Sequence, residues 1–268
     1  MNEHVAVLRS LREVWAAKAE GRPISMLTAY DAGFAQQAVQ AGVDFLLVGD
    51  SLGMVVQGGR DTLGVTIEDM VYHTRLVRRG APTSLVMADM PFLSDTSPDA
   101  AFVHAGALMR AGADIVKIEG GAAKADLIAS LTEAGIPVCA HIGLLPQRVR
   151  QLGGYRVQGR SEEDAARILT DARALVDAGA AMLLIECVPS GLAERITRQA
   201  SVPVIGIGAG QGVDGQVLVL QDVLGMNPNP PRFVRDFLRG RGSIVEALAA
   251  YVSAVQSRQF PAEHESYA

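Results

Sequence analysis

The sequence predicts a single (β/α)8 barrel that spans residues 1–268, and three observations support this fold class. Eight short apolar segments alternate along the chain with segments of helical pattern, which favours parallel strands joined by right-handed crossovers. Hydrophobic residues make up 49% of the chain but aromatic residues only 5%, so the core must be aliphatic, as in parallel sheets. No shift in composition marks a second domain. An open, doubly wound sheet is the alternative, because strand closure cannot be seen in a sequence.

An additional helix is expected before the barrel, since Leu8, Leu11 and Trp15 have helical spacing. This N-terminal segment lacks the uninterrupted apolar run of a signal peptide, and no run approaches the roughly 18 residues that span a bilayer. The net charge of −5, with mixed signs, argues against a nucleic-acid binder with a basic surface. Cys139 and Cys187 both lie in apolar runs and are expected to be reduced, buried thiols, with a disulfide as the alternative. We therefore expect a cytoplasmic protein without a nucleic-acid or membrane partner.

The elements follow from apolar runs and from helix start and stop signals. Thr66, with Asp69 three residues later, is typical of a capping box at a helix start, and Asp31 is expected to cap an earlier helix. The expected strands cover residues 24–29, 45–49, 84–88, 114–119, 137–141, 182–187, 202–207 and 216–221. The expected helices cover residues 31–41, 66–79, 98–110, 123–134, 162–178 and 189–200, with closing helices that end in 244–255.

Three segments are expected to lack regular structure. Polar loops are predicted from residue 50 to 64 and from 143 to 159. The polar tail, residues 259–268, is expected to be mobile unless it docks on a partner subunit.

The fourth expected strand carries two opposite charges on one face. Side chains alternate between the faces of a strand, so Lys117 and Glu119 point the same way. Burying two charges is costly, so they form either an ion pair in the core or part of a site for an anion and a cation.

Acidic residues end four of the expected strands, and active sites of such barrels lie at the carboxyl ends of the strands. Four carboxylates at one mouth would repel each other, and a divalent cation would relieve that repulsion. All-oxygen ligation favours magnesium or manganese over zinc. Lys117 and His141, on strands four and five, would face the same mouth. The acidic residues are Asp50, Asp89, Glu119 and Glu186.

Each of these residues also has a structural interpretation. Asp50 and Asp89 could cap the turns that follow their strands, and Lys117 with Glu119 could be an ion pair in the barrel interior. His141 could be a hydrogen-bonded structural histidine. The structural interpretation does not explain why acidic groups recur at the same end of four strands, so a catalytic metal site is favoured.

The glycine-rich segment 206–210 suggests a dinucleotide site only weakly, because its last glycine is misplaced and it lies late in the chain. Close backbone approach at the barrel mouth, or an anion site, explains these glycines better.

The segments at residues 48–54, 116–121 and 153–159, with four others, together resemble motifs of the ketopantoate hydroxymethyltransferase family. Two departures occur: Gly64 stands where the family usually has proline, and Leu145 where it usually has threonine. The motifs run in order over nearly the whole chain, at residues 28–31, 48–54, 116–121, 153–159, 186–189, 205–210 and 260–264.

The resemblance implies a (β/α)8 barrel that transfers a hydroxymethyl group from 5,10-methylenetetrahydrofolate to 3-methyl-2-oxobutanoate. The product would be 2-dehydropantoate, on the way to pantothenate and coenzyme A. The resemblance also implies Mg²⁺ as cofactor and a homodecamer as the assembly.

On this resemblance, Asp50 and Asp89 would bind the metal, with Glu119 in or near its shell. The metal would polarise the keto group and stabilise the enolate formed at C3. Lys117 would pair with the enolate oxygen or the substrate carboxylate rather than form a Schiff base.

Ser51 would hold the substrate carboxylate. Glu186 would be the general base, and His141 would orient the substrate or assist proton transfer. Two alternatives remain. One is a metal-dependent carbon–carbon lyase that acts on an oxo acid, and the other is a non-catalytic barrel with a binding role.

Overall fold

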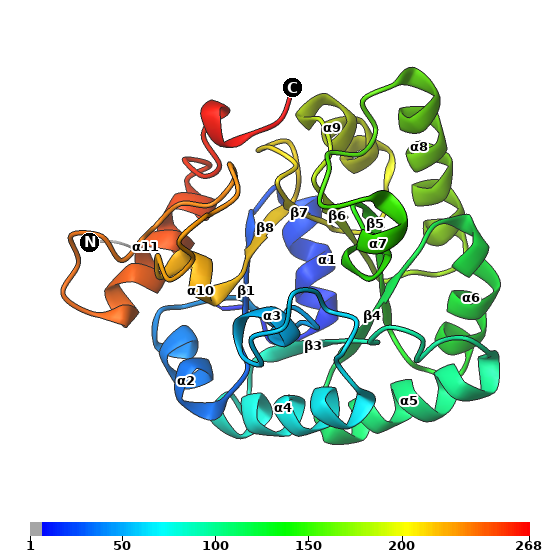
Figure 1. Ribbon diagram of the computed structural model, residues 1–268, viewed down its shortest axis with the longest axis horizontal. Helices are drawn as coiled ribbons and strands as arrows, with labels where there is room; N and C mark the ends of the chain where they lie inside the picture. Colours follow the sequence, from blue (N-terminus) through cyan, green and yellow to red (C-terminus); the bar gives the residue numbers. More distant parts are fainter. Residues whose placement is uncertain (1–6) are drawn as a thin grey trace.

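The computed structural model describes residues 7–268, in which eight parallel strands close into one barrel (Figure 1). The barrel closes because β1 pairs with β8, where Met26 lies opposite Val217. The predicted barrel is therefore confirmed over the open sheet. The strands are β1 (Ile24–Thr28), β2 (Phe45–Val48), β3 (Leu85–Asp89), β4 (Ile115–Glu119), β5 (Val138–Gly143), β6 (Met182–Glu186), β7 (Val204–Ile207) and β8 (Gly215–Leu218).

Helices surround the strands, and their start signals act as predicted. Asp31 accepts a hydrogen bond from the Phe34 amide at 2.9 Å, and Thr66 forms the capping box with Asp69. The surrounding helices are α2 (Ala32–Gln40), α4 (Ile67–Gly80), α5 (Pro98–Ala111), α6 (Ala125–Glu133), α8 (Glu162–Asp177), α9 (Ser190–Gln199) and α11 (Ile244–Gln256).

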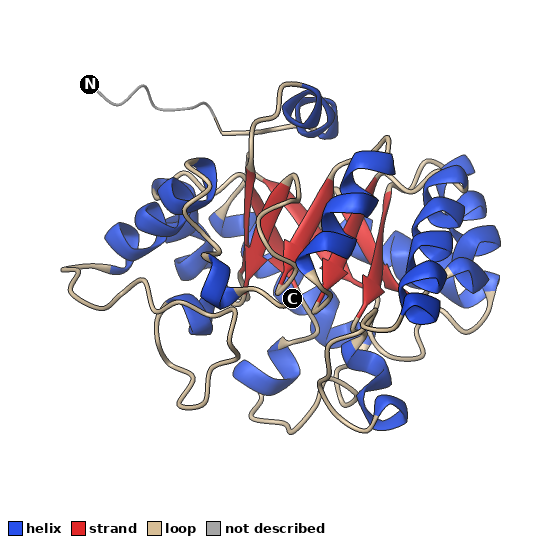
Figure 2. Cartoon of the chain, turned by 90° about the horizontal axis from the view of Figure 1, so that it is seen from above, coloured by secondary structure: helices blue, strands red, loops and turns tan. Residues whose placement is uncertain are grey.

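The N-terminal helix α1 (Leu11–Ala19) lies across the end of the barrel where the strands begin (Figure 2). It starts at Leu11 because Ser10 caps it, so Leu8 precedes the helix. Its side chains bond to the ends of elements beneath it: Trp15 Nε1 donates to the Ala181 carbonyl at 2.9 Å, and Lys18 Nζ pairs with Asp214 at 2.7 Å. This helix thus covers the barrel floor, away from the carboxyl ends of the strands.

The core is aliphatic, as predicted, and one buried tyrosine lies where the first and last strands of the barrel pair. Tyr251 of α11 is fully buried, and its hydroxyl lies 2.8 Å from the carbonyls of both Met26 and Gln216. Since these carbonyls belong to β1 and β8, α11 is held against the two strands whose pairing closes the barrel.

The chain departs from the predicted elements in three segments. The expected eighth strand is shorter, because residues after Leu218 turn into helix α10 (Leu220–Val223), whose first amide bonds to Thr28 Oγ1 at 2.8 Å. The two expected loops contain short helical turns. These are α3 (Leu52–Val55) in the first loop, and η2 (Pro146–Arg148) and α7 (Val149–Leu152) in the second.

The tail does not extend into solvent as expected but docks on its own barrel. Phe260 is buried in edge-to-face contact with Phe237, at 5.5 Å between ring centroids. Glu265, in the turn η3 (Glu263–Glu265), pairs with Arg235 at 2.6 Å, and the Tyr267 carbonyl accepts from the Ser190 amide at 2.9 Å. Polar composition suggested mobility, but one buried aromatic ring and one partly buried ion pair fix the segment.

Among residues 7–268, no helix combines the length and the apolar character needed to cross a bilayer. The two cysteines are buried free thiols, and burial raises the pKa of the Cys139 thiol to about 12.

Candidate active site

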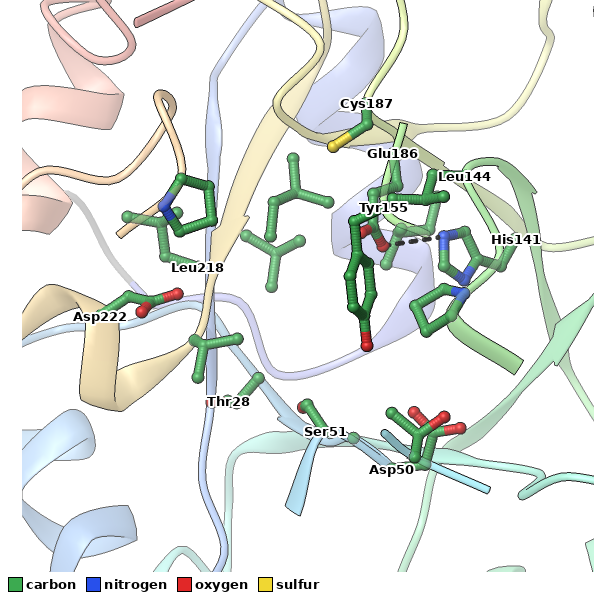
Figure 3. Close-up of a pocket in the computed structure, with 18 of the residues that line it drawn as sticks. Thr28, Asp50, Ser51, His141, Leu144, Tyr155, Glu186, Cys187, Leu218 and Asp222 are labelled. Atoms are coloured by element: carbon green, nitrogen blue, oxygen red, sulfur yellow. Dashed lines mark ion pairs between the residues drawn. The ribbon is translucent and has the colours of Figure 1, made fainter. Parts of the chain in front are cut away.

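A cavity of about 450 Å³ opens at the carboxyl ends of the strands (Figure 3). Its volume is in the range of small-molecule sites. All seven candidate residues from the sequence line this cavity: Asp50, Ser51, Asp89, Lys117, Glu119, His141 and Glu186.

The strand register explains why these side chains meet. Asp89 of β3 lies opposite Lys117 of β4, and Glu119 of β4 lies opposite His141 of β5. Asp50 lies two residues after the end of β2. Parallel strands in register bring their last residues to one level of the barrel, so the four expected carboxylates share a mouth.

Lys117 is the only cation in direct contact with this group among residues 7–268. Its Nζ lies 3.1 Å from Asp89 Oδ2, 3.7 Å from Glu119 Oε1 and 3.1 Å from His141 Nδ1. Burial alone would lower the pKa of Lys117, but the neighbouring carboxylates of Asp89, Glu119 and Asp50 raise it above its ordinary value. Lys117 is therefore protonated at neutral pH, which makes it a fixed cation and a poor amine nucleophile.

The carboxylates around Lys117 differ in their electrostatic environments. Burial, together with the nearby charges of Asp89 and Glu119, raises the pKa of Asp50 well above its usual range. Burial also raises the pKa of Asp89, against the opposing effect of Lys117. For Glu119, burial is outweighed by His141 and Lys117, and the pKa of its carboxyl is lowered. Lys117 alone therefore does not offset the cost of ionising all three carboxylates.

The side chains present fit a hard divalent cation. Asp89 Oδ1 and Glu119 Oε1 are buried oxygens without a hydrogen-bond partner, and a buried unpaired oxygen is costly unless it binds something. Within the described residues, however, no three His, Cys, Asp or Glu side chains form a ready metal cluster. Two carboxylates suffice for Mg²⁺, which usually completes its octahedron with water and substrate oxygens.

Glu186 and His141 form a second group in the cavity. His141 Nε2 lies 3.3 Å from Glu186 Oε2, the contact drawn as a dashed line in Figure 3. Burial and the charge of Lys117 act to lower the pKa of His141, but Glu119 and Glu186 outweigh them and raise it. Gly143 permits the close packing of β5 on β6: its φ is +87°, and a Cβ there would lie 2.3 Å from the Glu186 carbonyl oxygen.

Ser51 is held by a residue from the neighbouring strand end. Its Oγ lies 2.9 Å from the Tyr30 hydroxyl. Gly49 leaves room for this arrangement, because a Cβ there would lie 2.9 Å from Ser51 Oγ and 3.6 Å from Asp89 Oδ2. The Asp50 amide also donates to Asp89 Oδ2 at 3.0 Å, so the β2 and β3 ends are bonded to each other.

Gln147 is a functional candidate that strand-end reasoning missed. Its Nε2 donates to Asp50 Oδ2 at 2.8 Å and to the Met90 carbonyl at 2.9 Å, and its amide donates to Glu119 Oε2 at 3.1 Å. It lies in η2, beyond the end of β5. A search for functional residues at strand ends therefore does not include it. The only signal was its place beside Leu145 and Pro146 in a family motif.

Three further cavity residues were also missed: Tyr155, Asp222 and Tyr267. Tyr155 lies over the cavity from the second long loop, with its hydroxyl 3.2 Å from Met54 Sδ, and burial raises its pKa to about 12. Tyr267 comes from the docked tail. Asp222 comes from α10, which was expected to be strand.

Comparison with known proteins gives one consistent family. The model of the family described as ketopantoate hydroxymethyltransferase matches residues 9–263. A relative from Chromohalobacter salexigens, named 3-methyl-2-oxobutanoate hydroxymethyltransferase, is 54% identical over 96% of this chain and 98% of its own. A relative from Pseudomonas entomophila, named 3-methyl-2-oxobutanoate hydroxymethyltransferase 2, is 55% identical over 93% of this chain and 95% of its own.

Solved structures support the fold. Phosphonopyruvate hydrolase, solved with oxalate and Mg²⁺, aligns with a TM-score of 0.60 at 13% identity, over 93% of this chain and 96% of that one. A 2,3-dimethylmalate lyase of the PEP mutase/isocitrate lyase superfamily aligns with a TM-score of 0.58 at 20% identity, over 80% of this chain and 79% of that one. Identities this low bear on the fold alone.

Proposed function

The chain belongs to the ketopantoate hydroxymethyltransferase family, and on that premise we propose the reaction that it catalyses. It transfers a hydroxymethyl group from 5,10-methylenetetrahydrofolate to 3-methyl-2-oxobutanoate. Water supplies the hydroxyl, and the products are 2-dehydropantoate and tetrahydrofolate.

The observation that carries this proposal is the pairing of a cation with a base in one cavity. Lys117 is a buried, protonated cation among carboxylates, and Glu186 lines the same cavity beside His141. An oxo acid needs a positive environment for its oxygens and a base for the proton at C3. This arrangement supports deprotonation of an oxo acid at C3, followed by attack of the enolate carbon on the one-carbon unit.

Asp50 and Asp89 would hold Mg²⁺, with Glu119 in or near its shell. Asp89 Oδ1 and Glu119 Oε1 lack a hydrogen-bond partner, and a cation would relieve the repulsion that raises the pKa of Asp50. When bound, the ion would act as a Lewis acid on the keto oxygen. Lys117 would face the oxygen on which negative charge develops. Ser51, oriented by Tyr30, would bind the substrate carboxylate through its hydroxyl.

Glu186 would remove the proton from C3. Its side chain is mostly buried, and His141 Nε2 at 3.3 Å would orient it and stabilise its charge. Tyr155 would cover the cavity from its loop and limit the access of water.

The test is product formation by the purified protein. With Mg²⁺, 3-methyl-2-oxobutanoate and 5,10-methylenetetrahydrofolate, we expect 2-dehydropantoate to form, and omission of either substrate should abolish it. Lys117→Met and Glu186→Gln should each reduce turnover by about two to four orders of magnitude. Cleavage of an oxo acid without folate, with no folate-dependent product, would instead identify a carbon–carbon lyase.

We also propose that the enzyme acts in the cytoplasm as a homodecamer. Two buried free thiols suit a reducing compartment, and several large apolar side chains on and near α4 and α5 are exposed, as on a surface that meets another subunit. These are Tyr72, Phe92, Leu93 and Val103. Sedimentation equilibrium tests the assembly, and an active monomer would contradict it.

A further inference from the structure

One buried carboxylate in the cavity has no role in the proposed deprotonation. Asp222 lies on α10, four residues after the end of β8, and is only 7% exposed. Figure 3 places it across the cavity from His141 and Glu186, with its carboxylate directed inward. It therefore belongs to the same space as the reaction centre but faces it from the opposite wall.

The hydrogen bonds of Asp222 leave half of its carboxylate free. Asn227 Nδ2 donates to Asp222 Oδ1 at 3.0 Å, and the Asn229 amide in turn donates to Asn227 Oδ1 at 3.0 Å. Within residues 7–268 no donor and no cation pairs with Asp222 Oδ2. Burial raises the pKa of this carboxyl, which reflects the cost of keeping it charged away from water. A fixed, half-paired carboxylate that lines a cavity is suited to bind a donor from a ligand.

The surroundings of Asp222 restrict the kind of ligand. The lining just before Asp222 in sequence is apolar, with Leu218 and Val219, and the segment after it adds Pro231 and Phe233 to the cavity lining. An apolar wall with a single acceptor suits a flat ring that presents adjacent N–H donors on one edge. An oxo acid does not fit here, because its carboxylate would lie against Asp222 and be repelled.

We propose that Asp222 binds the 2-amino-4-oxopyrimidine edge of the pterin ring of the folate co-substrate. This inference rests on the proposed function, which requires a folate in the cavity. The pterin edge carries a ring N–H and an adjacent amino group, and a carboxylate can accept from both at once. Asn227 positions Asp222 by holding Oδ1.

The two ends of the cavity would then bind different substrates, according to the charge of each substrate. The anionic oxo acid binds where Lys117 and the metal-binding carboxylates lie, and the neutral pterin edge binds at Asp222. Because both ends belong to one cavity, the one-carbon unit of the folate can face C3 of the oxo acid.

The first experiment is steady-state kinetics of Asp222→Asn. The asparagine amide is uncharged, and it has one acceptor oxygen where the carboxylate has two. We therefore expect the KM for 5,10-methylenetetrahydrofolate to rise about 10- to 100-fold, from the loss of charge-assisted hydrogen bonds. The KM for the oxo acid should stay within about twofold. An unchanged folate KM would overturn the proposal.

Two controls separate a binding role from a structural one. Asp236→Asn changes a nearby carboxylate that packs behind Gly225 and accepts from the amides of Leu238 and Arg239, without lining the cavity. It should leave the folate KM near that of the unaltered protein, and an equal rise in both variants would mean that Asp222 acts only through packing. Deuterium exchange at C3 of the oxo acid, measured without folate, should be the same in Asp222→Asn and in the unaltered protein.

A second experiment uses the unaltered protein, so it stands even if Asp222→Asn fails to fold. Binding of tetrahydrofolate is compared with binding of its 2-desamino analogue by calorimetry in the presence of the oxo acid. We expect the analogue to bind about 10- to 100-fold more weakly, and Asp222→Asn to show little of this discrimination. Equal binding of both ligands to the unaltered protein contradicts the assignment. Absence of C3 exchange in the unaltered protein contradicts the proposed function instead.

Discussion

Replacing Lys117 with methionine removes the one lysine or arginine that pairs with this buried group of carboxylates among residues 7–268, and it keeps most of the side-chain volume. At an effective dielectric constant of about 20, the contacts at 3.1 and 3.7 Å correspond to attractions of about 5 and about 4 kcal/mol. Desolvation of the charges offsets part of this. Breaking such a buried pair by removal of one partner costs about 3–5 kcal/mol, because the other charges remain buried.

This loss should lower the melting temperature measurably. For a chain of 268 residues, an unfolding entropy of about 2 cal/mol/K per residue gives about 0.55 kcal/mol/K. The Lys117→Met variant should therefore melt about 5–9 °C lower at pH 8 in the absence of divalent ions. Thermal unfolding followed by circular dichroism is the assay.

The fall in melting temperature caused by Lys117→Met should also depend on pH, and its direction can be derived from the pKa shifts. Lys117 opposes the raised pKa values of Asp50 and Asp89, so its removal raises them further. A carboxyl with a raised folded pKa binds more protons when folded, and its destabilising effect grows as pH rises between the unfolded and folded pKa values. The deficit should therefore be smaller at pH 5.5 than at pH 8.

The matched control is Lys124→Met. Lys124 pairs with Asp95 at 2.7 Å, but both side chains are partly exposed, so the loss should be about 1 kcal/mol or less. If Lys117→Met melts within about 2 °C of the unaltered protein at pH 8, or shows the same deficit at both pH values, then the electrostatic reasoning about this site is wrong.

Three further predictions concern the metal, the loop and the tail. Mg²⁺ at 100 times its dissociation constant should raise the melting temperature by about 5 °C, and Asp89→Asn should remove most of this effect. Gln147→Ala removes the side-chain hydrogen bonds from the second long loop to Asp50 and to the Met90 carbonyl, so the KM for the oxo acid should rise about tenfold and proteolysis within 143–159 should accelerate; unchanged values of both would refute its positioning role. Arg235→Ala removes the arginine that pairs with the buried Glu265 and leaves only the Ala262 amide as a donor, so carboxypeptidase should digest the tail faster and the melting temperature should fall by about 2–5 °C; a tail as resistant as before would contradict its docking by this ion pair.

Most of the fold could be predicted because the barrel depends on local patterns. Seven of the eight strands were predicted within two residues at each end, and the capping box at Thr66 set the start of α4. The eighth strand was predicted too long, because the apolar run through Leu218 and Leu220 continues into α10, and periodicity cannot separate a short strand from a short buried helix.

The site residues at the ends of strands could be predicted from the sequence, and the site residues on loops could not. Asp50, Asp89 and Glu186 follow from the rule that active sites lie at the carboxyl ends of barrel strands. Loop and turn geometry brings Gln147 into contact with Asp50 and places Asp222 in the cavity wall, and this geometry depends on tertiary contacts that no periodicity encodes. The tail was mispredicted for a related reason: Phe260 and Glu265 are fixed by partners far away in the sequence.

The central claim is that this cavity removes the C3 proton of an oxo acid with Glu186 as the base. Deuterium exchange at C3 of 3-methyl-2-oxobutanoate, with Mg²⁺ and without folate, isolates this step from the transfer. The unaltered protein should exchange the proton, and Glu186→Gln should exchange it about 100- to 10,000-fold more slowly. Exchange by Glu186→Gln at the rate of the unaltered protein would contradict the account.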